Sequence, residues 1–303
     1  MTVSRLTIAE NGPEFSRIIP GLMRVKDWGL SAEGLRDWIH ACLDMGITTF
    51  DHADIYGDYE AEEIFGAALA LDPALRDKME LVTKCGIKLV SPNRPEHRLH
   101  TYDTSKDHII ASAERSLKNL KTDRIDVLLI HRPDPIMDAD EMAEALTILR
   151  NDGKILYAGV SNFLPHQHDL LQSRLDFPLV TNQIEFSVMQ TLPLYDGRLD
   201  QCQELRRAPM IWSPIAGGRM FTGTDERATR VRDALTQIGE ELGGAPMDQV
   251  ALAWIMMHPA RPMPVVGTGK LERIRGAVES DKLTMSREQW FVILEASHGH
   301  EVP

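Results

Sequence analysis

The sequence is poor in cysteine and contains no long apolar segment. Only three cysteines occur among its 303 residues, and no two of them stand at the short spacing of a redox or zinc motif. A disulfide framework and a zinc knuckle are therefore not expected. No run reaches the roughly 20 apolar residues that cross a membrane, and residues 1–8 lack the apolar centre of a signal peptide. We therefore expect a cytoplasmic protein that crosses no membrane.

Basic residues are outnumbered by acidic ones. The chain has 33 Lys and Arg against 45 Asp and Glu, which gives a formal net charge of −12. A surface of this charge is a poor partner for nucleic acid or for an anionic membrane. The length suits one large α/β barrel or two modest domains. Because no break in composition and no flexible linker divides the chain, a single domain over residues 1–303 is expected.

Short apolar runs alternate with amphipathic segments along the chain. Apolar runs bounded by turn residues are typical of buried strands, and a period of 3.6 is typical of helices. Alternation of strand and helix indicates a parallel sheet, and eight such units in about 250 residues match an α/β fold of the (β/α)8 TIM barrel type. The predicted strands are residues 21–23, 47–50, 79–83, 125–130, 155–160, 179–182, 210–212 and 263–266. The predicted helices are residues 31–46 (caps included), 61–71, 105–120, 140–150, 165–173, 199–207, 228–242, 247–258, 271–279 and 287–296.

The N-terminal segment predicts a β-hairpin. Residues 5–8 and 15–19 flank the turn formers at positions 11–13. A hairpin that precedes the first barrel strand would cover the bottom of the barrel. A doubly wound open sheet is the alternative fold. It requires a glycine-rich fingerprint after its first strand, whereas residues 21–24 read Gly-Leu-Met-Arg.

Titratable side chains stand where three consecutive predicted strands end. Asp51 follows the second strand, and Tyr56 lies five positions later. Lys84 follows the third strand and His131 the fourth. The carboxyl ends of barrel strands meet at one face, which carries the catalytic residues. Taken singly, Asp51 could be a turn cap, Lys84 a surface lysine and His131 a core histidine. Because burying the Asp51 charge is costly, we expect a cationic partner for it.

Together these groups suit proton donation. A free tyrosine titrates near ~10, which is too high for an efficient acid at neutral pH. A nearby ammonium favours the phenolate and lowers that pKa, and a buried carboxylate keeps the ammonium charged. We therefore expect Asp51 and Lys84 to lower the pKa of Tyr56. His131 would orient the substrate oxygen or help to move the proton.

Five motifs in this order resemble those of the aldo-keto reductase superfamily. The likeness extends from the predicted hairpin to about residue 290, which is nearly the whole chain. Residues 84–86, 131–135 and 285–290 further resemble a bacterial, YdhF-like subgroup of oxidoreductases. The five motifs are Phe-Asp-His-Ala-Asp-Ile-Tyr-Gly at 50–57, Thr-Lys at 83–84, Ile-His-Arg-Pro-Asp at 130–134, Gly-Val-Ser-Asn-Phe at 159–163 and Asn-Gln at 182–183.

This resemblance implies NADP(H)-dependent reduction of a small-molecule aldehyde or ketone to an alcohol, by a monomer or a small homo-oligomer. Tyr56 would be the general acid, Asp51 and Lys84 would set its acidity, and His131 would complete a catalytic tetrad. A different class stays open, because β-subunits of potassium channels share this fold and serve partly as cofactor-binding regulatory partners. A metal-dependent lyase or isomerase on the same barrel would need converging metal ligands, which Asp51 beside Lys84 and Tyr56 does not offer.

The resemblance also implies contacts with the nicotinamide and the pyrophosphate. Ser161, Asn162 and Gln183 match the family's amide-binding trio. Trp212 matches the aromatic residue that stacks on the nicotinamide. Strand-end capping and a core tryptophan are the plainer alternatives, although capping does not explain Gln183. Further expected contacts are Gly21 and Met23, at the first predicted strand, and a run that resembles the family's pyrophosphate loop, namely Ser213, Pro214, Ile215, Ala216, Gly217, Gly218 and Arg219.

The segment after the eighth predicted strand resembles the family's site for the adenosine 2′-phosphate. It leads into a helix N-terminus, which is a natural phosphate site. The sequence departs from the family at Gly267, where a lysine is frequent, and at residues 276–277, where Gly-Ala replaces Glu-Asn. Lys270 can supply the missing charge, so NADP(H) is favoured over NAD(H). The expected contacts are Gly267, Thr268, Gly269, Lys270 and Arg273.

Residues 86–104 form a long polar segment after the third predicted strand. Its position would place it at the rim of the active site, and it carries several lysine, arginine and histidine side chains. It could attract an acidic substrate, but charged loops are more often only solvated surface. A broad-specificity carbonyl reductase is the resulting expectation.

Overall fold

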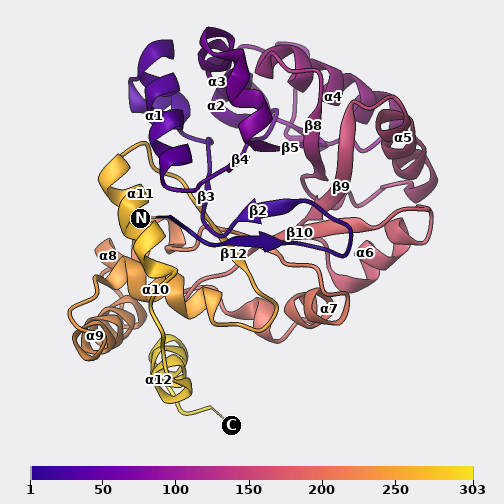
Figure 1. The fold of residues 1–303 in the computed structure, drawn as a ribbon. Helices are drawn as coiled ribbons and strands as arrows, with labels where there is room; N and C mark the ends of the chain where they lie inside the picture. The colour runs from indigo at the N-terminus through magenta and orange to yellow at the C-terminus, as the bar shows by residue number, and fades with distance from the viewer. Residues whose placement is uncertain (1, 303) are drawn as a thin grey trace.

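The computed structural model, which describes residues 2–302, is a barrel of eight parallel strands ringed by helices (Figure 1). Around the barrel the strands follow the order β3, β12, β11, β10, β9, β8, β5, β4. A bridge between Gly21 and Asp51 joins the two ends of this order, and the Leu22 amide donates to the Asp51 carbonyl over 2.9 Å. The predicted TIM barrel is confirmed. Its strands are β3 (Ile19–Pro20), β4 (Thr49–Asp51), β5 (Glu80–Cys85), β8 (Ile125–Ile130), β9 (Ile155–Ser161), β10 (Leu179–Glu185), β11 (Met210–Trp212) and β12 (Met263–Val266).

The N-terminal hairpin covers one end of the barrel. β1 (Arg5–Thr7) pairs antiparallel with β2 (Glu14–Ser16), and the pair lies across the barrel opening in Figure 1. Ile8 and Phe15 are fully buried and pack in one cluster with apolar side chains of the barrel strands. The amide of Ala208, just before β11, donates to the Ile8 carbonyl over 2.7 Å. The hairpin therefore covers the N-terminal ends of the strands, as predicted, and their carboxyl ends remain for the functional site.

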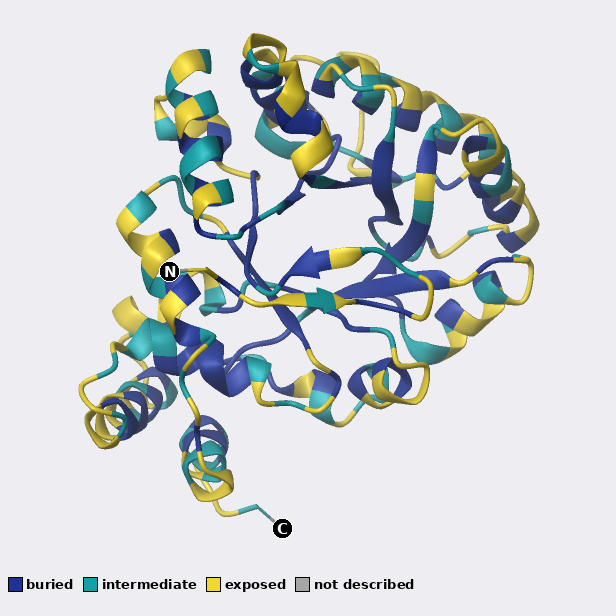
Figure 2. Cartoon of the chain, in the orientation of Figure 1, coloured by how far each residue is buried: buried dark blue, intermediate teal, exposed yellow. Residues whose placement is uncertain are grey.

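Amphipathic helices cover the outside of the barrel. Figure 2 shows their buried residues toward the sheet and their exposed residues toward solvent. At the start of α1 the Ser31 side chain accepts from the Gly34 amide, and at its end Gly46 turns the chain with a φ of +76°. No helix within residues 2–302 has the length and apolar character that a membrane crossing requires. The longer helices are α1 (Ala32–Asp44), α3 (Ala61–Leu71), α4 (Lys106–Leu120), α5 (Ala139–Asn151), α6 (Pro165–Gln172), α7 (Arg198–Glu204), α9 (Glu226–Glu241), α10 (Met247–Met256), α11 (Leu271–Ser280) and α12 (Arg287–His298). Shorter turns are η1 (Val25–Trp28), α2 (Tyr56–Tyr59), η2 (Pro73–Lys78), η3 (Leu192–Leu194), η4 (Ala216–Gly218) and α8 (Arg219–Thr222).

Two predicted elements need correction. The first barrel strand is β3, at Ile19–Pro20, and not residues 21–23, since beyond the Gly21 bridge the chain turns. The polar segment after β5 contains an antiparallel pair, β6 (Ile87–Lys88) and β7 (Thr101–Tyr102). The strands β3, β6 and β7 have two residues each, which is too short to show an alternating pattern in the sequence. Pairing with a neighbouring strand sets their positions.

Candidate active site

A buried ion pair lies at the carboxyl end of the barrel. Asp51 is the last residue of β4, and Lys84 lies near the end of the adjacent parallel strand β5. Lys84 Nζ donates to the two Asp51 carboxylate oxygens over 2.7 and 2.9 Å and to the His52 carbonyl over 2.6 Å. The Lys84 side chain is 0% exposed and that of Asp51 is 3% exposed. The cationic partner predicted for Asp51 is therefore present.

Tyr56 and His131 complete a cluster around this ion pair. Tyr56 begins the short turn α2 beyond β4, and its hydroxyl accepts from Lys84 Nζ over 3.2 Å. The Tyr56 and His131 rings meet edge to face, with centroids 5.9 Å apart. The His131 amide donates to the Cys85 carbonyl over 2.8 Å, which places His131 directly beyond β8 and beside the end of β5. The four side chains predicted from the strand ends thus lie together.

Burial controls the protonation of these groups. Burial raises the pKa of Tyr56 above its ordinary value, and the Lys84 ammonium opposes this shift only in part. The expected lowering of the Tyr56 pKa was therefore wrong in sign, since it considered the ammonium but not the loss of water around the phenol. Burial disfavours the Lys84 ammonium, but the charges of Asp51 and Tyr56 outweigh that effect and raise the pKa of Lys84. Burial, reinforced by Lys84 and Arg132, holds the pKa of His131 well below its usual range, so this imidazole is neutral at pH 7.

Polar residues at the ends of β9 and β10 join the cluster. Asn162 adopts a left-handed φ of +63°, and its Nδ2 donates to Ser161 Oγ over 2.8 Å. Trp212 Nε1, at the end of β11, donates to Asn162 Oδ1 over 2.9 Å. Gln183 Nε2 donates to Asp51 Oδ1 over 2.8 Å. The four residues predicted to hold a nicotinamide thus lie beside the tetrad, and the contact between Gln183 and Asp51 is one that the sequence did not predict.

The loop after β11 has an unusual backbone. Ser213 and Ala216 have φ values of +50° and +51°, which are rare for residues other than glycine and gather at functional sites. Gly217 and Gly218 also have positive φ, and a Cβ added to either would meet no atom within 4 Å. Their backbone therefore borders open space that a ligand can approach. Arg219 follows, is exposed, and lies 3.7 Å from Asp225. These features fit a cofactor pyrophosphate.

The junction of β12 and α11 forms a second open, basic loop. A Cβ added to Gly267 would meet nothing within 4 Å, whereas one at Gly269 would lie 2.5 Å from the Trp28 ring. The amide of Lys270, the residue before α11, donates to Thr268 Oγ1 over 3.2 Å. Lys270 and Arg273 are both exposed at this helix N-terminus. The residues present therefore fit a phosphate group.

The remaining residues expected near the cofactor lie where β3 meets β4. Gly21 is buried and forms the bridge to Asp51. Met23, two positions on, is 49% exposed. Both therefore lie beyond the carboxyl end of the first strand.

For the described part of the chain, no group of three or more His, Cys, Asp and Glu side chains is arranged to hold a metal ion.

A buried acidic group behind the site was not predicted. Asp54, two positions before Tyr56, is 5% exposed, and neither of its carboxylate oxygens has a hydrogen-bond partner among the described residues. Burial and then the nearby Glu62 raise the pKa of Asp54 to about 8, while Arg115 opposes the shift. The sequence shows Asp54 only as a polar loop residue, because nothing in its spacing reveals that helices α3 and α4 cover it.

Replacing Asp54 by asparagine is expected to make the stability less sensitive to pH. The pKa of Asp54 is higher in the folded protein, at about 8, than in the unfolded chain, at about 3.8. This difference stabilises the fold fully below pH 3.8, and the contribution is lost as the pH rises to about 8. The unfolding free energy of the wild type should therefore fall relative to Asp54→Asn by up to ~1.4 kcal/mol per pH unit in this window. Urea unfolding at pH 5, 6.5 and 8 measures the difference. Asp107→Asn, on the exposed face of α4, is the control, and parallel profiles for Asp54→Asn and wild type would contradict the expectation.

Comparison with known proteins relates the whole chain to several oxidoreductases. Residues 17–297 match the family model described as the aldo/keto reductase family. The chain is 52% identical over 301 residues to the uncharacterized oxidoreductase YcsN of Bacillus subtilis and to the oxidoreductase YdhF of Escherichia coli, over 99% of this chain and 100% of each relative. It is 46% identical over 290 residues to the 6-dehydroglucose reductase of Agrobacterium fabrum, over 95% of this chain and 96% of that protein. The structure of the glycerol dehydrogenase AKR11B4 from Gluconobacter oxydans superposes with a TM-score of 0.83 at 25% identity, covering 99% of this chain and 95% of that one.

Proposed function

Because the chain belongs to the aldo/keto reductase family, we propose that it is an NADPH-dependent oxidoreductase that reduces aldehydes or ketones to alcohols. The observation that carries this proposal is the position of Lys84 Nζ, which lies 2.7 Å from the Asp51 carboxylate and 3.2 Å from the Tyr56 hydroxyl. An acid, its stabilising cation and that cation's counter-ion are thus in direct contact at the carboxyl end of the barrel. This is the arrangement needed to protonate a carbonyl oxygen as it gains negative charge.

In the proposed reaction, Tyr56 is the proton donor. The nicotinamide supplies the hydride when it is bound. Tyr56 gives its phenolic proton to the substrate oxygen, and the Lys84 ammonium, which opposes the rise of the Tyr56 pKa caused by burial, favours this transfer. Lys84 stabilises the phenolate that remains, and Asp51 holds Lys84 in position. The neutral His131 beside the Tyr56 ring orients the substrate oxygen.

The proposed preference for NADPH depends on the loop between β12 and α11. Lys270 and Arg273 bring two exposed cations to a helix N-terminus, and the 2′-phosphate is the group that distinguishes NADPH from NADH. Ser161, Asn162 and Gln183 would bind the carboxamide, and Trp212 would stack on the ring. The open backbone at Gly217 and Gly218 would receive the pyrophosphate.

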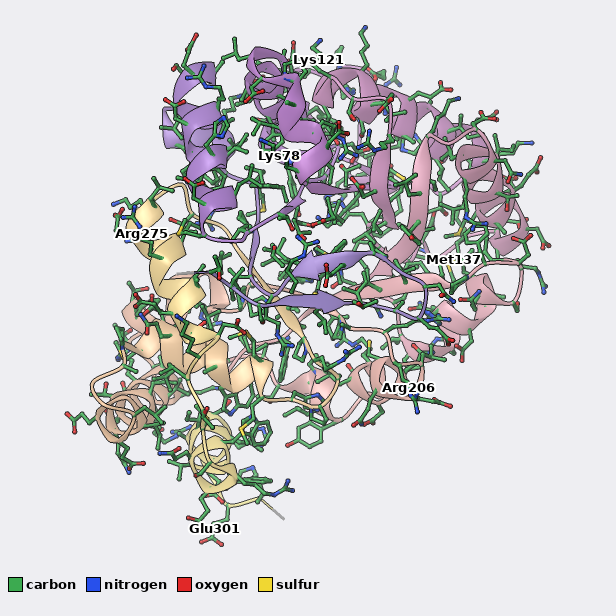
Figure 3. All side chains as sticks on the ribbon, in the orientation of Figure 1. Lys78, Lys121, Met137, Arg206, Arg275 and Glu301 are labelled. Carbon is green, nitrogen blue, oxygen red and sulfur yellow. The ribbon has the colours of Figure 1, made fainter. Side chains whose placement is uncertain are left out.

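Replacing Arg273 by alanine is expected to raise the Kd for NADPH about tenfold or more, since a charge-assisted contact with phosphate contributes roughly 1.5–3 kcal/mol. The Kd for NADH should change less than twofold, because NADH lacks the 2′-phosphate. Fluorescence titration with both cofactors measures the two constants. Arg275→Ala is the matched control, because Arg275 is exposed on α11 (Figure 3) but lies two positions along, on a different face of the helix. Equal losses for NADPH and NADH would contradict the assignment.

A substrate panel tests the proposed reaction. The assay follows the loss of NADPH absorbance. The substrates tested are aromatic aldehydes, aliphatic aldehydes, α-dicarbonyls and quinones. A sugar aldehyde belongs in the panel, since a relative that is 46% identical is named 6-dehydroglucose reductase. We expect substrate-dependent oxidation of NADPH. Tight binding of NADPH without turnover of any carbonyl would reject the reductase and favour a cofactor-binding regulatory protein.

A further inference from the structure

A cavity lies away from the tetrad, between the two helices α9 and α12. These helices pack against each other (Figure 1), with the start of α9 near the end of α12. The cavity is open to solvent, has a volume of about 490 Å³ and is also lined by Thr191 and Tyr195, on the segment that follows β10. Glu301, labelled in Figure 3, marks this end of the molecule. Asp51, Tyr56, Lys84 and His131 do not line the cavity.

The lining of this cavity is basic. Arg227 and Arg230 point into it from the first two turns of α9, and His298 and His300 come from the end of α12 and the residues beyond it. Arg227 is held in place by its Nη2, which donates to Ser297 Oγ over 2.9 Å. Arg230 Nε donates to the Ala296 carbonyl over 3.2 Å. Neutral oxygens thus position both guanidinium groups without cancelling their charge.

These charges have little compensation within residues 2–302. No carboxylate oxygen described there lies within 4 Å of the Arg227 guanidinium, and Arg227 Nε is buried without a hydrogen-bond partner. Arg230 has only Glu226, 3.9 Å away, with a side chain that is 98% exposed. Burial, and then the charge of Arg219, lower the pKa of Arg227. Asp225 opposes this shift, and Arg230 adds to it. Two partly buried cations side by side are unfavourable unless an anion joins them, and both arginines are exposed enough for an anion to reach them.

We propose that this cavity is a binding site for a small molecule that carries a phosphate or carboxylate group. Guanidinium groups match both anions through paired hydrogen bonds. Hydroxyl groups from Ser297, Thr191 and Tyr195 surround the arginines and can accept or donate toward the polar remainder of such a ligand. A volume of about 490 Å³ lies within the usual range for small-molecule sites. None of the lining residues belongs to the cofactor loops proposed above, although Arg219 of the loop after β11 lies near enough to act on Arg227.

Calorimetric titration of the full-length protein with sodium sulfate and with sodium acetate, at constant ionic strength set by chloride, tests the proposal. We expect saturable binding of at least one of the two anions, weakened at least tenfold in Arg227→Gln/Arg230→Gln. Arg36→Gln/Arg287→Gln removes the same charge from a partly exposed position on α1 and an exposed one on α12, both outside the cavity, and should keep the wild-type affinity. Equal weakening in both double variants, or no saturable binding by the wild type, would overturn the proposal.

Two further experiments show whether the measured anion binding occurs in this cavity or elsewhere on the protein. Saturating NADPH occupies the proposed phosphate loops near Gly218 and Thr268, so anion binding that persists with NADPH belongs to the cavity. Loss of the arginine-dependent signal with NADPH would show that the cavity is part of the cofactor site and would overturn the separate site. If Arg227→Gln/Arg230→Gln does not fold, as judged by circular dichroism, His298→Gln/His300→Gln replaces it. That variant is expected to weaken binding as well, and unchanged affinity in it would contradict the proposal.

Discussion

Replacing Tyr56 by phenylalanine is expected to lower kcat by a factor of about 10²–10⁴, the usual contribution of a positioned general acid. The substitution removes one oxygen atom, which is the atom that accepts from Lys84 Nζ over 3.2 Å. The aromatic ring, its edge-to-face contact with His131 and the backbone turn after β4 are retained. The Kd for NADPH should therefore change less than twofold. Stopped-flow hydride transfer and cofactor titration on the same preparation measure the two effects separately.

A matched control separates the proton donor from a general effect of losing a hydroxyl group. Tyr157→Phe makes the same change on β9, where Tyr157 packs against the apolar interior of the barrel outside the tetrad. It should leave kcat within about twofold of the wild type. If Tyr56→Phe also kept the wild-type kcat, Tyr56 would be rejected as the acid, whatever the activity of the wild type.

Much of the fold could be predicted because the barrel strands are short, buried apolar runs with polar ends. The bounds of β8, β11, β12 and α3 agree with those predicted from the sequence. The first strand was misplaced, because Ile19–Pro20 has no pattern of its own. Its position is set by Val265 and Val266 of β12, which pair with it in parallel. Such a contact between residues about 250 positions apart cannot be read from local periodicity.

The sequence predicted which residues form the site, but not the pKa shifts and the buried contacts of their charged groups. Strand ends indicated which side chains would meet, since parallel strands present their carboxyl ends at one face. The sign of the Tyr56 pKa shift could not be predicted, because it depends on how burial compares with the Lys84 charge. Asp54 and the contact of Gln183 with Asp51 were missed for a similar reason. The first depends on which helices cover Asp54, and the second on which distant side chain reaches Asp51.

Replacing Lys84 by methionine is expected to reduce both activity and stability. Methionine approximates the length of the lysine stem, so the main loss is the ammonium that contacts Asp51, Tyr56 and the His52 carbonyl. Asp51 would then be a buried carboxylate with only the Gln183 amide as a donor. Breaking a buried ion pair on one side costs roughly 3–5 kcal/mol. Urea unfolding measures this loss, and Lys88→Met, at a lysine whose side chain is 30% exposed, should cost less than ~1 kcal/mol.

The double variant Asp51→Asn/Lys84→Met shows whether the cost arises from the unpaired charge. With the carboxylate replaced by a neutral amide, no charge is left buried, so stability should recover by at least ~2 kcal/mol relative to Lys84→Met. Activity should not recover, because the cation that stabilises the Tyr56 phenolate is still missing. A double variant no more stable than Lys84→Met would show that lost packing, and not the Asp51 charge, causes the instability. Recovered activity would show that Tyr56 works without Lys84. The two measurements thus distinguish the structural role of the ion pair from its proposed catalytic role.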